Sequence, residues 1–250
     1  MRKALLLLTL VVCPLFAGAD DAPIQDNSFL IEEAYNQEAG VVQHIFTFNR
    51  AEHGLWASTF TQEWPVVSLR HQFSFTVPML KPGSDSGVGD VLLNYRYQLA
   101  GDGSSRVAFS PRVSLILPTG SERRGLGAGR TGIQAMLPLS TVLAPRFVAH
   151  SNLGATVIPE RHSRQYTAGG SLVWLAHQRI NPLVEVLWTR NISSNFREDV
   201  TLVSPGIRWS YDLPHNLQLV PGVAFPIAIG GHGDRSVFIY FSAEHPFSAN

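Results

Sequence analysis

The chain has 250 residues, of which 45% are hydrophobic and only 15% are charged, with 19 basic and 19 acidic side chains. An ordinary soluble domain has a charged fraction of roughly 25%. The balanced charge gives no sign of a nucleic-acid partner. The one cysteine, Cys13, lies in an apolar stretch near the start, so an internal disulfide is excluded.

The first 19 residues have the pattern of a secretory signal. Arg2 and Lys3 form the positive start, residues 4–16 are apolar, and residues 17–19 are small. We expect cleavage near Ala19. Beyond it, no apolar run approaches the ~18 residues that a membrane helix needs.

Alternation is the dominant pattern of the remaining chain. Between Val66 and Val77, apolar side chains largely take every second position, and Ser, Arg, Gln and Thr fill the positions between them. In a β-strand, successive side chains point to opposite faces, so each such stretch forms a ribbon with one apolar face. Repeated behind an export signal, the pattern predicts a barrel whose apolar face contacts lipid.

We predict an all-β fold, a transmembrane antiparallel up-and-down β-barrel of about twelve strands over residues 41–247. An even number of strands places both chain ends on one side of the membrane. The expected strands are 41–49, 55–64, 66–77, 88–99, 106–117, 130–140, 146–157, 166–177, 182–190, 200–212, 216–228 and 236–247.

The expected connections alternate in length, as they do between the two sides of an outer-membrane barrel. The longer ones, expected outside the cell, are 78–87, 118–129, 158–165, 191–199 and 229–235. Trp56 and Trp64 share one strand face and fit two aromatic girdles. The alternative is a soluble β-sandwich with these aromatic residues in its core.

Residues 20–40 precede the barrel. Within residues 24–38, apolar side chains have helical spacing, so we expect a short helix or a plug-like segment. One alternative is a disordered periplasmic leader. The other is a plug in the barrel mouth whose glutamates meet lumen arginines. The plug candidates are Phe29, Glu32, Glu33 and Tyr35.

Charged residues on the polar strand faces are candidates for lining the lumen. Because buried unpaired charges are costly, these groups must pair or be hydrated. They form either a salt-bridge network that closes the barrel or a polar constriction that selects solutes. The candidates are Arg70, Asp90, Arg96, Arg112, Glu185, Arg208, Asp212 and Glu244.

Enzymatic motifs are weak in this sequence. His150, Ser151 and Asn152 suggest a barrel-embedded hydrolase acting on lipid or lipopolysaccharide, but adjacent strand residues face opposite ways. Residues 127–132 fit a dinucleotide fingerprint, yet alternation rather than a helix follows them. The histidines lack metal-ligand spacing. We therefore predict no catalytic residue, no metal and no cofactor.

Several short segments, taken in order, resemble a known family. They are residues 25–38, 87–90, 95–97, 117–120, 125–127 with Gly132, 220–226 and 244–247. The chain is similar here to bacterial outer-membrane transporters associated with the meta-cleavage pathway of phenol degradation. The resemblance implies a barrel in the outer membrane of a Gram-negative bacterium that moves small solutes, aromatic or hydrophobic ones among them.

The last strand alternates up to Phe247. This ending resembles the aromatic-ended strand that the barrel-insertion machinery reads. The expected partners are therefore outer-membrane lipid, that machinery and a small solute. The function predicted from sequence is a passive channel, and the alternatives are the hydrolase and a closed structural barrel.

Overall fold

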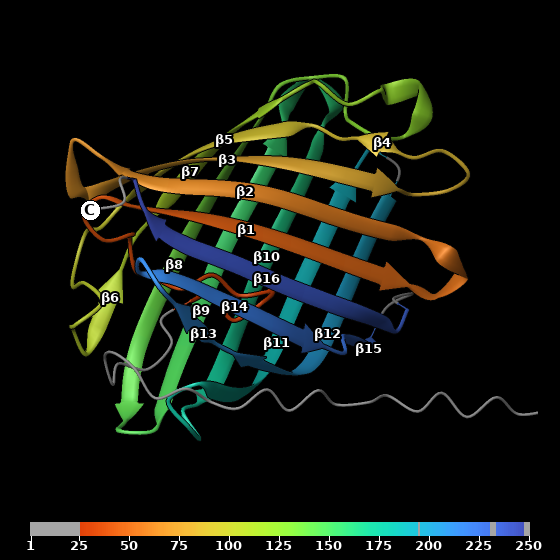
Figure 1. Ribbon diagram of the computed structural model, residues 1–250. Helices are drawn as coiled ribbons and strands as arrows, with labels where there is room; N and C mark the ends of the chain where they lie inside the picture. Colours follow the sequence, from red (N-terminus) through yellow and green to blue (C-terminus); the bar gives the residue numbers. More distant parts are fainter. Residues whose placement is uncertain (1–25, 195, 231–233, 248–250) are drawn as a thin grey trace, which may run out of the picture.

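A computed structural model describes residues 26–194, 196–230 and 234–247. The expected signal sequence, with its cleavage site and Cys13, lies outside these residues. Within them, the fold is a closed antiparallel barrel with twelve strand positions and almost no helix. Strand β16 pairs with both β14 and β1, and this pairing closes the sheet on itself (Figure 1). The predicted fold class is confirmed.

The twelve wall positions correspond to the twelve expected strands. They are β1 (Val41–Ala51), β2 (Trp56–Val66), β3 (Ser68–Lys81), β5 (Val91–Tyr97), β7 (Arg112–Leu117), β8 (Gly132–Ala144), β9 (Phe147–Ile158), β10 (Ser163–Trp174), β11 (Ile180–Ser193), β12 (Phe196–Trp209), β14 (Leu217–Ala224) and β16 (Ser236–Pro246). Four short strands extend the wall: β4 (Gly87–Val88), β6 (Val107–Phe109), β13 (Tyr211–Leu213) and β15 (Ile227–Gly230). Three 3-10 turns lie in the connections: η1 (Glu52–Gly54), η2 (Glu122–Arg124) and η3 (Pro159–Arg161).

The barrel is apolar outside and polar inside. On β7, Val113 and Leu115 are 53% and 42% exposed, whereas Arg112 and Ser114, which alternate with them, are buried. The same alternation holds on the neighbouring strand, where Asn94 is buried opposite Ser114. A soluble sandwich buries its apolar faces against each other, so that alternative is wrong. No helix among the described residues is long and apolar enough to span a bilayer.

The connections expected at residues 158–165 and 191–199 are both shorter than predicted, and only residues 159–162 separate β9 from β10. Residues 191–199 were predicted as a long connection, but β11 continues to Ser193 and β12 begins at Phe196. An ion pair holds this hairpin together, because Arg190 Nε donates to Asp199 Oδ1 at 2.7 Å on the facing strand. The polar composition of this stretch reflects charged side chains on strands, not an irregular loop.

The segment before β1 lies inside the barrel, where Figure 1 shows its trace behind β16 and β14. We name residues 26–38 the plug. The expected helix is wrong, because the backbone of the plug forms only bends and extended stretches. Its N–H groups bond instead to side chains of the barrel wall, as the three successive N–H groups of Phe29, Leu30 and Ile31 bond to Glu185. Further along, the N–H groups of Asn36 and Gln37, which a helix would donate to its own carbonyl groups, bond to Gln98 and Gln72.

The inside–outside pattern predicts how the wall tolerates charge. Leu153 is 59% exposed on the outer face of β9, next to the inward Asn152. Leu153→Arg should lower the free energy of unfolding by roughly 2–4 kcal/mol if the site lies near the bilayer midplane. The measurement is the urea midpoint of unfolding from lipid vesicles. Thr189→Arg, on the lumen face with Glu185, is the control and should shift the midpoint much less.

A plugged lumen as the candidate functional site

Glu185 fixes the innermost turn of the plug. Its Oε1 accepts hydrogen bonds from the N–H groups of Phe29, Leu30 and Ile31 at 2.9, 2.8 and 3.1 Å. The turn is closed by a bond from the Ser28 N–H to the Ile31 carbonyl at 3.2 Å. Glu185 lies in the middle of β11 and is fully buried. A carboxylate that accepts several backbone N–H bonds forms a strong, directional anchor.

Asp26 anchors the start of the plug to the last barrel strand. Its carboxylate accepts hydrogen bonds from Tyr240 and Ser242 on β16 and from Gln43 on β1. Arg208 of β12 donates to the carbonyl groups of Asp26 and Asn27, the latter at 2.7 Å. The plug is therefore tied to strands on both sides of the closing seam.

Glu32 forms the central ion pairs. Its carboxylate contacts Arg96 Nη2 at 2.9 Å and Arg112 Nη2 at 2.5 Å, from the neighbouring strands β5 and β7. Burial acts to raise the pKa of the Glu32 carboxyl, but the charges of Arg112 and Arg96 lower it to about 2. Asn152 on β9 bonds to both the N–H and the carbonyl of Glu32, at 2.8 and 2.9 Å.

The plug leaves the barrel along a row of amide side chains. The Asn36 N–H donates to Gln98 Oε1 at 3.0 Å, and the Gln37 N–H donates to Gln72 Oε1 at 2.8 Å. The Nε2 of Gln98 also donates to the carbonyl of Ala34 at 2.8 Å. Neutral wall side chains thus satisfy the plug backbone where it has no charged partner.

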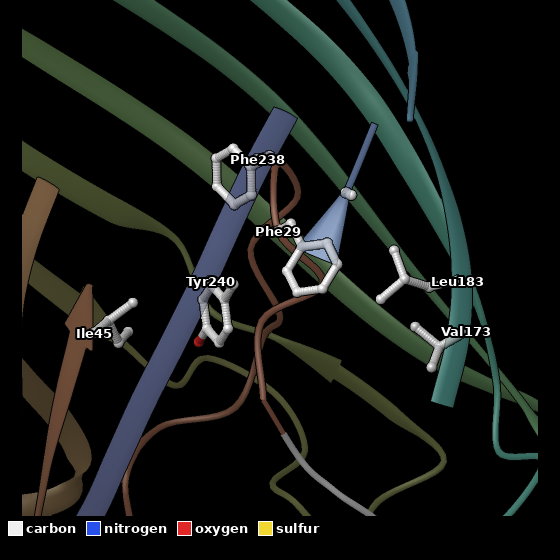
Figure 2. Close-up of a cluster of buried hydrophobic side chains, with 7 residues drawn as sticks. Phe29, Ile45, Val173, Leu183, Phe238 and Tyr240 are labelled. Carbon is white, nitrogen blue, oxygen red and sulfur yellow. The ribbon is translucent and has the colours of Figure 1, made fainter. Parts of the chain in front are cut away.

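Phe29 supplies the apolar contact of the plug. Its ring centroid lies 5.3 Å from that of Tyr240 and 5.9 Å from that of Phe238. Figure 2 shows the ring between these two residues of β16 and the aliphatic side chains on the opposite wall. Gly206 and Gly222 make room for it, since a Cβ on Gly222 would lie 2.5 Å from the ring.

The other plug candidates are also buried. One oxygen of the Glu33 carboxyl has no hydrogen-bond partner among the described residues, and burial raises the pKa of this group well above its ordinary value. The Tyr35 ring meets the His150 ring edge-on, with centroids 6.3 Å apart. Both side chains therefore face the lumen wall rather than the periplasm.

The predicted hydrolase residues are divided between the two faces of the wall. Ser151 is exposed on the outer face, whereas His150 is buried on the lumen face. His150 Nδ1 instead contacts Ser140 Oγ at 2.7 Å, and that oxygen accepts the Ala34 N–H at 2.8 Å. Because the plug covers this hydroxyl, the contact supports the plug and offers no accessible nucleophile.

The predicted lumen charges separate into two groups. Arg96, Arg112, Glu185 and Arg208 all bond to the plug, and Glu244 is half-buried opposite Gln43. The remaining three lie elsewhere. Arg70 is exposed, and Asp212 is exposed beside Gln218 and Arg179. Asp90 accepts the N–H groups of Gly120 and Ala128 at 2.9 and 2.7 Å and so holds the connection between β7 and β8.

The site also contains residues that were not predicted from the sequence. A cavity of about 240 Å³ lies between the plug and the wall formed by β1, β2, β3, β5 and β7. Four threonines line it, together with apolar side chains and the Glu32 ion pairs. Glu63, also in its lining, is 7% exposed and accepts Gln72 Nε2 at 2.6 Å.

A separate group lies in the connections outside the lumen. Glu52, His53 and Asp234 bring donor atoms within 4.8 Å of one another, and Glu52 and His53 are exposed. Because Asp234 lies far from Glu52 and His53 in the sequence, the spacing of residues could not indicate this group. Exposed acidic residues often gather without an ion, so this group carries no assignment.

Removing the charge of Glu32 tests the central ion pairs. Glu32→Gln leaves two buried guanidinium groups without a counter-charge, so the free energy of unfolding should fall by about 3 kcal/mol. The difference from wild type is measured from urea midpoints at several pH values. Because the pKa of Glu32 is lowered to about 2 from 4.5, this difference should be full above pH 5, decline below pH 4.5 and vanish near pH 2. A difference that did not depend on pH would contradict the assignment.

Comparison with solved structures supports the fold. An outer membrane channel from Pseudomonas putida F1 has a TM-score of 0.62 and 13% sequence identity, over 85% of this chain and 97% of that chain. The NanC porin has a TM-score of 0.55 and 7% identity, over 82% of this chain and 98% of that one. The KdgM porin has a TM-score of 0.51 and 10% identity, over 82% and 99%.

No curated protein matches the chain. Its residues 19–226, however, match the family described as "Putative MetA-pathway of phenol degradation". This match covers most of the sequence, including the plug and eleven of the twelve wall positions. The chain belongs to that family.

Proposed function

We propose that the protein is a passive channel for small solutes in the outer membrane of a Gram-negative bacterium. The barrel is closed, its outer face is apolar and its lumen is polar, as a water-filled membrane pore requires. The solved structures of similar fold are named as channels and porins. In this proposal, the end of the barrel at which β1 begins and β16 ends faces the periplasm, and the connection that contains η2 faces outward.

One observation carries the proposal: four charged side chains of the lumen wall bond to the plug. Arg96 and Arg112 pair with Glu32, and Glu185 and Arg208 bond to the plug backbone. A purely structural barrel would be expected to pair these charges across its wall. Here, movement of the plug would leave a hydrated, charged pore.

The contacts of the plug are suited to reversible release. They are mostly hydrogen bonds and ion pairs, and water can replace these partners when the plug moves. Its apolar contacts lie in two small clusters, one around Phe29 and one formed by Ala34, Tyr35 and Ala108. We propose that the plug sets the permeability of the resting channel and that solutes pass when the plug is displaced.

The protein is proposed to have no enzymatic activity, because the buried contact between Ser140 and His150 is covered by the plug. If a lipid-hydrolysis assay gave turnover that His150→Ala abolished, the hydrolase would replace the channel. Lipid and the barrel-insertion machinery remain predicted partners.

Releasing the plug should increase permeability. In Gly222→Leu, the new side chain would occupy the space of the Phe29 ring. Liposomes containing this variant should swell several-fold faster in small sugars than liposomes containing wild-type protein. Gly83→Leu is the matched control, since a Cβ at Gly83 meets nothing within 4 Å. If neither wild type nor Gly222→Leu admitted solutes, the closed structural barrel would be the better description.

A further inference from the structure

A pair of histidines lies on the seam where the barrel closes. His44 Nε2 is 3.2 Å from His245 Nε2, although 201 residues separate the two in the sequence. His44 belongs to β1 and His245 to β16, the first and last strands of the wall, which pair with each other. No spacing pattern records such a separation, so the sequence could not indicate this pair.

Both histidines are on the outer face of the barrel. Gln43 and Ile45, the neighbours of His44 in β1, are buried on the lumen side, so His44 points the other way. On β16, His245 alternates in step with Phe241, whose ring is exposed on the outer face. The pairing register makes the two histidines diagonal neighbours on that face. They are therefore separate from the plug and its contacts.

A hydrogen bond fixes the tautomer of His245. Its Nδ1 lies 2.8 Å from the carbonyl oxygen of Pro246. Because a carbonyl oxygen only accepts, Nδ1 carries the ring proton, and Nε2 of the neutral ring has a lone pair. Histidines that bind metals are typically oriented in this way, with the other ring N–H donated to a carbonyl or a carboxylate. The lone pair of His245 Nε2 faces His44.

The ring of His44 is held from both sides. It stacks on the ring of Phe60 on β2, with centroids 6.1 Å apart, and on the ring of His245, with centroids 5.3 Å apart. In the metal-free protein, the Nε2–H of His44 donates to His245 Nε2. If the ring proton of His44 moves to Nδ1, both Nε2 lone pairs face the same space. This change of tautomer requires no change in the fold.

The distance between the two nitrogens fits a metal ion. Two nitrogens that bind one Zn²⁺ tetrahedrally at about 2.0–2.1 Å are roughly 3.3 Å apart, and here they are 3.2 Å apart. Imidazole suits Zn²⁺, Cu²⁺ and Ni²⁺, whereas Mg²⁺ and Ca²⁺ prefer oxygen ligands. A tetrahedral ion has two further positions, which water can fill.

The pair lies near one end of the wall, where water can reach it. His245 is the last residue but one of β16, and His44 is three residues from the start of β1. At ~3.3 Å per residue and a tilt of ~40°, His44 is about 8 Å from that end. Both side chains are half-buried. A bound ion would therefore stay hydrated at the edge of the apolar band.

We propose that His44 and His245 together bind one divalent transition-metal ion of the class that Zn²⁺ represents. The ion links the first strand of the barrel to the last and so fastens the seam at its periplasmic end. The site is outside the lumen, and the inference does not rest on the proposed channel function.

Zn²⁺ alone is the probe. It is titrated by calorimetry into the full chain, prepared without a polyhistidine tag, in nanodiscs of phosphatidylcholine, and empty nanodiscs give the background. We expect saturable binding of one ion per chain. His44→Gln and His245→Gln each leave a single imidazole at the seam and should each weaken binding at least about tenfold.

Two other histidines provide controls. His71 is the matched control, because its Nδ1 contacts the Tyr95 hydroxyl at 2.6 Å. His53 tests the exposed group that it forms with Glu52 and Asp234. Both His71→Gln and His53→Gln should bind Zn²⁺ as tightly as the wild type. Urea midpoints measured in EDTA show that each variant is folded.

The stability of the barrel gives a second measurement. Replacing EDTA by Zn²⁺ should raise the urea midpoint of the wild type, because the ion binds only where the two strands are paired. Neither seam variant should show this shift. The inference would be overturned if the wild type bound no Zn²⁺ saturably, or if both seam variants bound it as tightly as the wild type. Zn²⁺ binding that His53→Gln abolished would also overturn it.

Discussion

A membrane barrel of this kind must place its polar side chains inside, and inside they need partners. The outer face of β7 illustrates the constraint, because its apolar residues alternate with the buried Arg112 and Ser114. A desolvated guanidinium or carboxylate group without a partner would cost several kcal/mol. In this protein the partners come from the plug, whose carboxylates and backbone groups bond to the wall. The plug and the lumen wall therefore share one network of hydrogen bonds and ion pairs.

The contacts of the plug are distributed and individually modest. Asp26, Glu185 and Glu32 hold three successive parts of it, and neutral glutamines hold its exit. Such an arrangement fixes one conformation without a large apolar interface. It also leaves a cavity on one side, because the plug crosses the lumen as a single extended chain and cannot fill the whole cross-section. The plug therefore both obstructs the lumen and forms part of the cavity lining.

The barrel could be predicted from the sequence because its signal is local. Period-two alternation identifies the two faces of most strands and located the wall, although the expected strands 55–64, 130–140 and 166–177 alternate poorly. The conformation of the plug was harder to predict from the sequence. Its apolar spacing indicated a helix, but Gln98 and Gln72, which lie 62 and 35 residues away, accept the N–H groups of Asn36 and Gln37 that a helix would use. Arg70 and Asp212 occupy the alternate positions that face the lumen in their strands, yet both side chains are exposed where the wall meets solvent. Alternation shows which face of the strand a residue occupies, but it does not show how far along the barrel axis the residue lies. The four threonines that line the cavity come together through the register of three strands, and no single stretch of sequence records that register.

The contact between Asp26 and the last strand bears on assembly. Asp26 bonds to Tyr240 and Ser242, which follow it by 214 and 216 residues. The partners are separated by almost the whole length of the chain, so the barrel must be built nearly to its end before Asp26 can form these bonds. The anchor at Asp26 can therefore form only after β16 has been added, and its formation marks the completion of the cylinder.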